Sequence, residues 1–282
     1  LKSEGKMQAN GAGSGHMEAG LTKVSSLELG DATIKNQVFV VLPLDQMANT
    51  EGVAMPGMAG YETFRRFVTR VDYGHGTLTL IDPKTFDAKD AGVAIPITFN
   101  GNSIEAQATF NGVSGNFTVD TGSRASLTLN APFVARNNLR KSAGKGVDAV
   151  AGWGVGGPSR AYVARGNALK LGPFEIKGPV VEYATDKGGA FAQADLAGNI
   201  GAGILKRYIV TLDYNHSKMY LKPGAAIADL DTFDRAGLWI NEDGHGFKIV
   251  DITKGAPAEA AGLKDGDIIT AVDGKAAKDI HI

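Results

Sequence analysis

The sequence predicts a mainly β protein in which two copies of one domain are followed by a smaller third unit. The chain has 282 residues, 38 of them glycine, and short alternating apolar runs lie between Gly and Asn turn signals. A long segment recurs at a spacing of 141 residues, far longer than the period of a solenoid repeat. From about Thr232 the pattern changes, which marks the third unit.

The repeat is gapless between residues 57–80 and residues 198–221. Identical residues occupy these equivalent positions: Gly57 and Gly198, Gly60 and Gly201, Arg66 and Arg207, Asp72 and Asp213, Tyr73 and Tyr214, His75 and His216, Leu80 and Leu221. Upstream, residues 27–38 match residues 169–180 one residue out of step, and glycines also recur: Gly11, Gly13 and Gly15 match Gly152, Gly154 and Gly156. We therefore expect residues 26–83 and 167–223 to form equivalent β units about a pseudo-twofold axis. The recurring Asp and His residues are interpreted as parts of a shared hairpin turn.

The local patterns define the elements and their boundaries. In the second copy, strands are expected at 94–99, 104–110, 115–119, 147–151, 159–164, 167–171, 174–183, 208–214 and 218–222. Asn111-Gly112 is a hairpin signal, and Asn130 with Pro132 predicts a short helix to about Asn138. A helical turn is expected near 202–207. The predicted domains are 1–83, 97–223 and 236–282, with linkers at 84–96 and 224–235.

The most informative motif is Asp120-Thr121-Gly122-Ser123, which follows the alternating run Phe117–Val119. This order places a carboxylate on a tight turn at the end of a strand. Gly122 allows backbone amides to approach the carboxylate, and the Thr121 and Ser123 hydroxyls can hold the loop through local hydrogen bonds.

This motif and two others, in the same order, resemble the retropepsin-like aspartic peptidases. Asp120 matches the catalytic aspartate of that family, and Thr121, Gly122 and Ser123 match its active-site loop. The run Gly152, Trp153, Gly154, Val155, Gly156 resembles the flap hairpin that covers substrate. Ile200 and Gly201 resemble the apolar-Gly motif that supports the catalytic loop. The resemblance covers about 97–223, and 6–83 as a lobe without its front, and implies two β-barrel lobes with a cleft between them.

Peptide hydrolysis by this family requires two carboxylates that share a proton, one to activate water and one to protonate the substrate. The equivalent of Asp120 in the first copy would lie about twenty residues before Leu1. We therefore interpret the chain as a fragment whose second aspartate comes from a missing N-terminal segment or from a homodimer partner. As a monomer the fragment is expected to be inactive.

Two features near the flap have competing interpretations. Gly152, Gly154 and Gly157 also satisfy the G-x-G-x-x-G dinucleotide fingerprint, which requires a helix directly afterwards. Residues 158–163 read as strand, which argues against that fingerprint. Trp153 could shield the cleft or simply pack on a neighbouring strand.

The third unit resembles a bacterial PDZ domain, most clearly over residues 255–274. A strand is expected at 246–252 and a short helix at 256–263. Gly237, Leu238 and Trp239 lie where that family binds the carboxylate of an extended peptide. The domain is expected to be cut short, so peptide capture and a purely structural role remain open.

Composition excludes several classes of function. Lys and Arg number 29 against 30 Asp and Glu, so no electrostatic attraction to nucleic acid or membranes is implied, and no apolar run is long enough to span a bilayer. The chain has no Cys and five scattered His, so neither a metal nor another cofactor is expected. The expected function is a bacterial aspartic endopeptidase acting on peptide or protein substrates, in a periplasmic or secreted location. The alternative is a non-catalytic peptide-binding scaffold that uses the PDZ domain.

Overall fold

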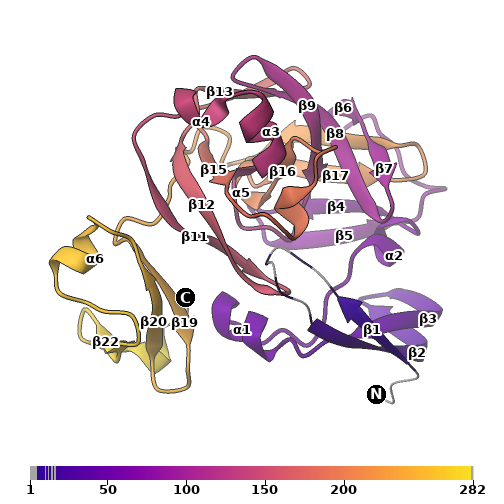
Figure 1. The fold of residues 1–282 in the computed structure, drawn as a ribbon. Coiled ribbons are helices and arrows are strands. Elements are labelled where there is room, and N and C mark those ends of the chain that lie inside the picture. The colour runs from indigo at the N-terminus through magenta and orange to yellow at the C-terminus, as the bar shows by residue number, and fades with distance from the viewer. Residues whose placement is uncertain (1–4, 10, 12, 14, 16, 281) are drawn as a thin grey trace.

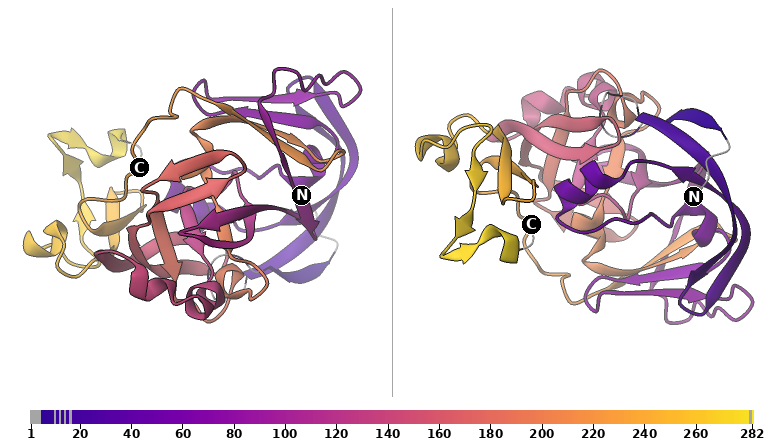
Figure 2. Two further views of the ribbon diagram at one scale, coloured as in Figure 1. Left: turned by 90° about the horizontal axis from the view of Figure 1, so that it is seen from above. Right: turned by 90° about the horizontal axis from the view of Figure 1, so that it is seen from below.

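The computed structural model describes residues 5–9, 11, 13, 15, 17–280 and 282 (Figure 1). Strands account for 46% of the chain and helices for 12%, so the mainly β fold class is confirmed. Figure 2 shows the C-terminal unit at one end of the molecule and, on the opposite side, the sheet of β1 (Lys6–Ala9), β2 (Met17–Leu29) and β3 (Ala32–Val41). Among the described helices, none has the length and apolar character needed to cross a membrane.

The second copy is built on a ten-stranded sheet with helices packed beside it. Along the sheet the strands are β11 (Gly146–Gly154), β12 (Gly157–Arg165), β15 (Val180–Ala184), β10 (Leu127–Leu129), β16 (Gly198–Ile200), β9 (Val113–Val119), β8 (Ser103–Phe110), β13 (Ala168–Leu171) and β14 (Phe174–Lys177), with β7 (Thr98–Asn100) on β8. The helices are α3 (Ala131–Arg136), α4 (Leu139–Ser142), the 3-10 turn η1 (Ala190–Ala192) and α5 (Ala202–Leu205). Apolar side chains from these strands form one core, in which Phe110, Phe117 and Leu127 are completely buried.

A second sheet joins the two copies and shows their twofold relationship. Its order is β5 (Thr77–Ile81), β4 (Val68–Asp72), β17 (Tyr208–Asp213), β18 (Lys218–Pro223) and β6 (Val93–Pro96). At the β4–β17 junction Arg70 lies opposite Thr211, its own equivalent in the repeat, and the pairs on either side exchange equivalent positions in the same way. Such a self-complementary register places a pseudo-twofold axis at the Arg70–Thr211 pair.

The recurring Asp and His residues lie in equivalent hairpin turns, as the repeat predicts. Asp72 Oδ1 accepts the backbone N–H of His75 at 3.2 Å, and Asp72 Oδ2 lies 2.9 Å from His75 Nδ1. In the second copy Asp213 Oδ1 accepts the His216 N–H at 3.2 Å, and Oδ2 lies 2.7 Å from His216 Nδ1. Both aspartates thus close turns in the shared sheet.

In the first copy, the segment before α2 (Tyr61–Phe64) lacks the neighbouring backbone that surrounds the equivalent segment of the second copy. The described elements of the first copy are β1 (Lys6–Ala9), β2 (Met17–Leu29), β3 (Ala32–Val41), α1 (Asp45–Glu51) and α2, followed by β4 and β5. A Cβ built on Gly57 or Gly60 meets nothing within 4 Å, whereas one on Gly198 lies 2.0 Å from Thr128 O and one on Gly201 lies 2.2 Å from Ala125 O. The segment before α2 is therefore open where its equivalent before α5 is enclosed by the Asp120 loop and β10.

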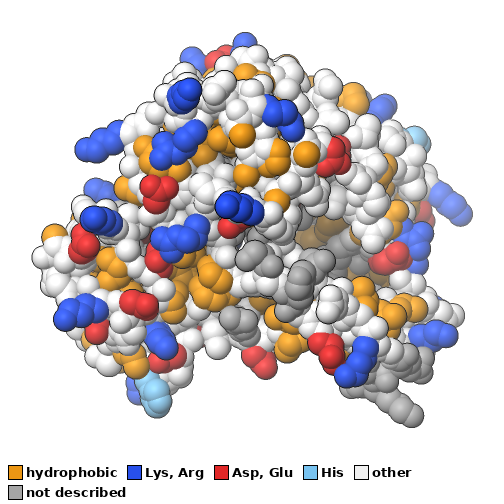
Figure 3. Space-filling model, in the orientation of Figure 1, with side chains coloured by type: hydrophobic (Ala, Val, Ile, Leu, Met, Phe, Trp, Pro, Cys, Tyr) orange, Lys and Arg blue, Asp and Glu red, His pale blue; other side chains and the backbone are white. Residues whose placement is uncertain are grey.

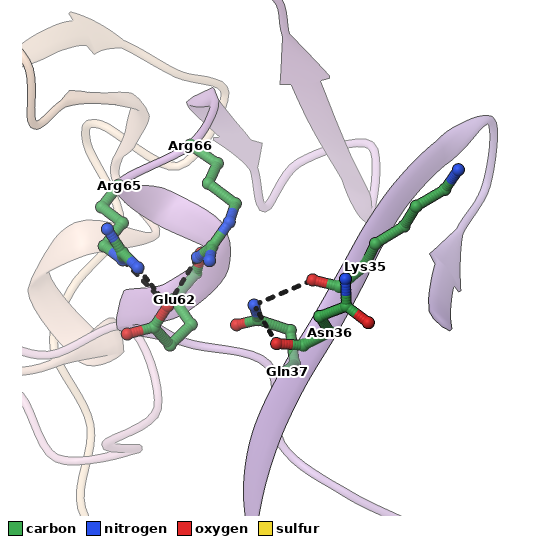
Figure 4. A network of polar contacts seen from close by, with 6 residues as sticks. All are labelled: Lys35, Asn36, Gln37, Glu62, Arg65 and Arg66. Atoms are coloured by element: carbon green, nitrogen blue, oxygen red, sulfur yellow. Dashed lines mark hydrogen bonds and ion pairs between the residues drawn. The ribbon is translucent and has the colours of Figure 1, made fainter. Parts of the chain in front are cut away.

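The two copies also differ at a recurring arginine. In the first copy Glu62 Oε2 pairs with Arg66 Nη1 at 2.5 Å and with Arg65 Nη2 at 2.8 Å (Figure 4). The equivalent of Glu62 is Gly203, so Arg207 has no such carboxylate. Arg207 is buried, and its Nε has no hydrogen-bond partner within the described part of the chain. The backbone plan is thus shared while side-chain contacts have diverged.

The different environments of the repeated glycines predict different costs of adding a methyl group. Gly198→Ala should lower the free energy of unfolding by about 2 kcal/mol or more, because its Cβ would overlap the backbone of β10. Gly57→Ala should change it by less than about 0.5 kcal/mol, because that Cβ meets open space. Urea unfolding of both variants measures the difference. Equal effects of the two substitutions would contradict the enclosed position of Gly198.

Several predicted boundaries are wrong for identifiable reasons. The single strand at 174–183 is two strands, because Gly178 has φ +59° and Pro179 has no N–H to continue the ladder. Strand β6 begins at Val93, within the segment 84–96 expected to link the copies, and pairs with β18. Asn130 precedes α3, but its side chain donates to Gln193 O at 3.0 Å instead of capping the helix.

The C-terminal unit comprises β19 (Leu238–Glu242), β20 (Phe247–Ile252), α6 (Pro257–Ala260), β21 (Ile268–Ile269), β22 (Ala271–Val272), β23 (Lys275–Ala276) and the 3-10 turn η2 (Ala277–Asp279). Helix α6 is shorter than predicted, because Gly262 adopts φ +82° after it. The linker at 224–235 is packed against the second copy. Asp231 accepts hydrogen bonds from Ser126 Oγ and the Val180 N–H, both at 2.7 Å.

Candidate active site

Asp120 lies directly after β9, on a loop held by the segment that precedes α5. Strand β16 runs parallel to β9, and the Asp120 N–H donates to Ile200 O at 3.0 Å. The Gly122 N–H donates to Asp120 Oδ1 at 2.9 Å, which fixes the orientation of the carboxyl group. Gly201 must be glycine here, because a Cβ would lie 2.2 Å from Ala125 O. The Ile200-Gly201 segment thus supports the loop from behind.

The role predicted for the Ser123 hydroxyl differs from the structure. Within the described chain no hydrogen bond joins Ser123 Oγ to the Asp120 carboxyl, and the Thr121 side chain makes none either. Ser123 Oγ lies 3.0 Å from where a Cβ of Gly201 would stand. Its backbone N–H reaches Asp120 O at 3.4 Å, and its carbonyl accepts the Ala202 N–H at 2.7 Å. The loop is held mainly by backbone groups.

A cavity of about 160 Å³ adjoins Asp120. Its walls come from several parts of the chain, which include the Asp120 loop, Glu51 of α1, Thr128 of β10, Trp153 of the β11–β12 hairpin, Glu182 of β15, Phe191 of η1 and Trp239 of β19. A space of this size accommodates one side chain rather than a length of peptide. Residues distant in the sequence therefore enclose the space in front of Asp120.

The β11–β12 hairpin, called the flap below, forms the roof of this cavity. Gly154 pairs with Gly157, so the strands run into the tip and leave Val155 and Gly156 as the turn. The tip meets the first copy's glycine-rich segment, where the Gly13 N–H donates to Val155 O at 3.2 Å and the Gly15 N–H to Gly156 O at 3.1 Å. The two equivalent tips thus contact each other. Strand β12, not a helix, follows Gly157, so the dinucleotide interpretation is wrong.

The C-terminal unit holds the flap from outside. The rings of Trp153 and Trp239 are stacked, with centroids 6.4 Å apart and planes at 27°. Arg160 Nη1 pairs with Asp251 Oδ1 at 2.7 Å, and the Val150 N–H donates to Asp251 Oδ2 at 3.3 Å. On the face drawn in Figure 3, hydrophobic side chains gather where this unit meets the flap, among interspersed charges of both signs. Trp153 therefore combines both sequence interpretations, since it borders the cavity and packs on a neighbouring strand.

The loop that contains Gly237 already holds a carboxylate of its own chain. Asp234 Oδ1 accepts the Ala236 N–H at 3.1 Å, while Oδ2 accepts the Leu238 N–H at 3.2 Å and also bonds the Gly237 N–H. Gly237 has φ +77°, and a Cβ there would lie 2.1 Å from Ala256 Cβ. The amides expected to receive a peptide carboxylate are thus occupied by Asp234 in this structure.

The sequence interpretation missed the ionisable residues Glu51, Arg124 and Glu182 of the cavity wall, and Tyr73 near Asp120. Burial raises the pKa of Glu182 to about 7, against the opposing hydrogen bond from Thr128. Burial, and then the charge of Asp120, raise the pKa of the Tyr73 phenol in the first copy to about 12. The signal for Glu182 is visible in the sequence, because it is a single charge in the apolar run Val180–Ala184. Tyr73 reaches the site only through the twofold arrangement.

No group of three or more His, Asp or Glu side chains within the described residues could hold a metal ion.

Two protein-family models match parts of the chain. Residues 106–204 match the family model described as aspartyl protease, and residues 248–281 match that of the PDZ domain. The chain therefore carries an aspartyl protease domain over residues 106–204 and a PDZ domain over residues 248–281. The protease match contains Asp120, the flap and the Ile200-Gly201 segment.

Solved structures also show likenesses. A retropepsin-like aspartic protease from Rickettsia conorii is 17% identical, with a TM-score of 0.32, over 46% of this chain and 88% of its own. EIAV protease in complex with the inhibitor HBY-793 is 21% identical, with a TM-score of 0.28, over 39% of this chain and 91% of its own. Basic 7S globulin from soybean is 14% identical, with a TM-score of 0.43, over 81% and 76%. A comparison with curated protein sequences found no significant match.

The contact between the PDZ domain and the flap predicts a measurable restraint. Asp251→Ala should speed amide hydrogen exchange in β11 and β12, because it removes the partner of Arg160 and of the Val150 N–H. The matched control is Asp265→Ala, at an exposed position of the same domain. Exchange followed by mass spectrometry measures the difference. Unchanged flap exchange in Asp251→Ala would show that the flap does not depend on this contact.

Proposed function

We propose that the protein is an aspartic endopeptidase in which Asp120 activates the water that attacks a peptide bond. The supporting observation is the position of Asp120, half-buried at a cavity that the flap covers and with Oδ1 held by the Gly122 N–H. In the proposed reaction, ionised Asp120 accepts a proton from water as the oxygen attacks the carbonyl carbon. A second carboxyl, initially protonated, donates to the carbonyl oxygen, and a proton then passes to the leaving amine as the C–N bond breaks.

The second carboxyl is proposed to come from a segment outside residues 1–282 that completes the first lobe. The open surroundings of Gly57 and Gly60 support this source, because their equivalents are enclosed by the Asp120 loop and its strand. A homodimer is less favourable. Strands β4 and β5 already occupy the twofold-related position beside β17, so a second copy would have to displace them. Residues 1–282 alone are therefore proposed to be inactive as a monomer.

The PDZ domain is proposed to control the flap and to recognise peptide or protein partners. Its stacking of Trp239 on Trp153 supports the first role. For peptide recognition, the ligand must use an edge strand or displace Asp234 from the loop amides.

A statine inhibitor, which mimics the tetrahedral intermediate, tests the peptidase proposal. The full-length protein should hydrolyse an unfolded protein substrate at acidic to neutral pH, and statine should block the reaction competitively. Chelators and serine-directed reagents should leave it unchanged. Hydrolysis that resists statine would contradict an aspartic mechanism at Asp120.

A further inference from the structure

Glu182 presents a nearly buried carboxyl group to the cavity beside Asp120. It lies on β15 next to Thr128 of β10, and Thr128 Oγ1 donates to Glu182 Oε2 at 2.6 Å. The residue is 7% exposed and lines the cavity, and its Oε1 accepts no hydrogen bond from the described residues. The facing position on β12 is Val163, which offers no polar partner. One oxygen is therefore fixed while the other is left for a ligand.

The charges around the cavity do not balance. The charged residues that line it are Glu51, Asp120, Arg124 and Glu182. Arg124 Nε pairs with Glu51 Oε2 at 3.2 Å, and the Arg124 guanidinium carbon lies 6.0 Å from the centroid of the Trp239 ring. Nearby, Arg160 is taken by Asp251. Within the described residues neither Asp120 nor Glu182 forms an ion pair, and once it is ionised the buried Glu182 carboxylate favours a cationic ligand.

The shape of the cavity suits a long cationic side chain. Its volume of about 160 Å³ admits one side chain, and Trp153 and Trp239 stand at its edge. The aliphatic stem of lysine packs well on such rings, and its ammonium group can reach a carboxylate beyond them. An uncharged side chain of a peptide would find no charged partner in this cavity, whereas a lysine side chain could pair with Glu182.

We propose that Glu182 selects substrates with a lysine or arginine side chain in the subsite next to Asp120. This inference rests on the proposed peptidase function and names its substrate class. Glu182 is a specificity residue in this account. It binds the substrate side chain and takes no part in transferring protons to the scissile bond.

Binding of paired peptides tests the selection without requiring turnover. In the full-length Asp120→Asn protein at mildly alkaline pH, a lysine peptide should bind at least about 10-fold tighter than the same peptide with norleucine. Glu182→Gln should remove this difference, and Glu182→Met serves as a second variant if the first fails to fold. The control Glu175→Gln, on an exposed part of β14, should keep the difference. Equal affinities for the two peptides, or no binding of either, would overturn the inference.

Hydrolysis separates this inference from the proposed function. With Asp120 intact and at neutral pH, where Glu182 can ionise, kcat/KM for the lysine peptide should exceed that for the norleucine peptide by at least about 10-fold, and Glu182→Gln should bring the two values together. Hydrolysis of both peptides at equal rates would overturn the role of Glu182 and leave the peptidase proposal standing. Lysine-selective binding without any hydrolysis would support the role of Glu182 and contradict the peptidase proposal.

Discussion

Asp120→Asn should lower peptide hydrolysis by the full-length protein by at least about 10³-fold and leave its fold intact. The amide is nearly isosteric with the carboxylate and can still accept the Gly122 N–H. It cannot take a proton from water, so the loss concerns the general base, whose contribution is typically 10² to 10⁴-fold. The substitution should change kcat far more than the affinity for substrate.

The measurement is steady-state hydrolysis of a peptide by wild type and variant, with circular dichroism to check the fold. Asp195→Asn is the matched control, since Asp195 is exposed in the same domain and should tolerate the change. Retained hydrolysis in a clean preparation of Asp120→Asn would refute the catalytic assignment.

Glu182→Gln should change the free energy of unfolding in a pH-dependent way. Its effect should be about 3 kcal/mol more stabilising at alkaline pH than at acidic pH. The folded protein holds the Glu182 proton up to a pKa of about 7, whereas the unfolded chain releases it near 4.5. Between these values the unfolded state binds fewer protons, so wild-type stability falls as pH rises. The whole shift corresponds to about 3 kcal/mol. Glutamine has no charge to desolvate and does not incur this loss.

Urea unfolding of both proteins at pH values on either side of this window measures the difference. The stability of Glu182→Gln relative to wild type should increase from acidic to alkaline pH and then level off. Glu175→Gln controls for the loss of one negative charge at an exposed site. A stability difference that does not change with pH would mean that the buried Glu182 is not held protonated in the native state.

The repeat in the sequence predicts the architecture from α2 to β5 and from α5 to β18. In these segments residues separated by 141 positions occupy equivalent elements, and the register of Arg70 with Thr211 follows the same symmetry, whereas β1, β2 and β3 form a sheet of their own. This success has a physical basis, because turn residues and alternating side chains act locally and specify the same hairpin twice. The position of Asp120 on a loop between strands was predictable for the same reason.

Other parts depend on contacts that no local pattern reveals. The contact of Trp239 with Trp153 joins two domains, and the pairing of β6 with β18 forms only when the shared sheet is assembled. Glu182 could be recognised as an unusual charge in a strand, but its position beside Asp120 requires the parallel pairing of β15 with β10. For Ser123 the local pattern is misleading. Its hydroxyl is close to Asp120 in the sequence, but in the structure it packs against Gly201 and does not bond the Asp120 carboxyl group.

The central claim is that Asp120 is one half of a catalytic pair, and the specific activity of two proteins tests it most directly. Purified monomeric residues 1–282 and the full-length protein are assayed on an unfolded substrate over a range of concentrations. The account predicts no turnover by the monomer of residues 1–282, and statine-sensitive turnover by the full-length protein. Statine-sensitive turnover by the monomer, with specific activity independent of concentration, would contradict it.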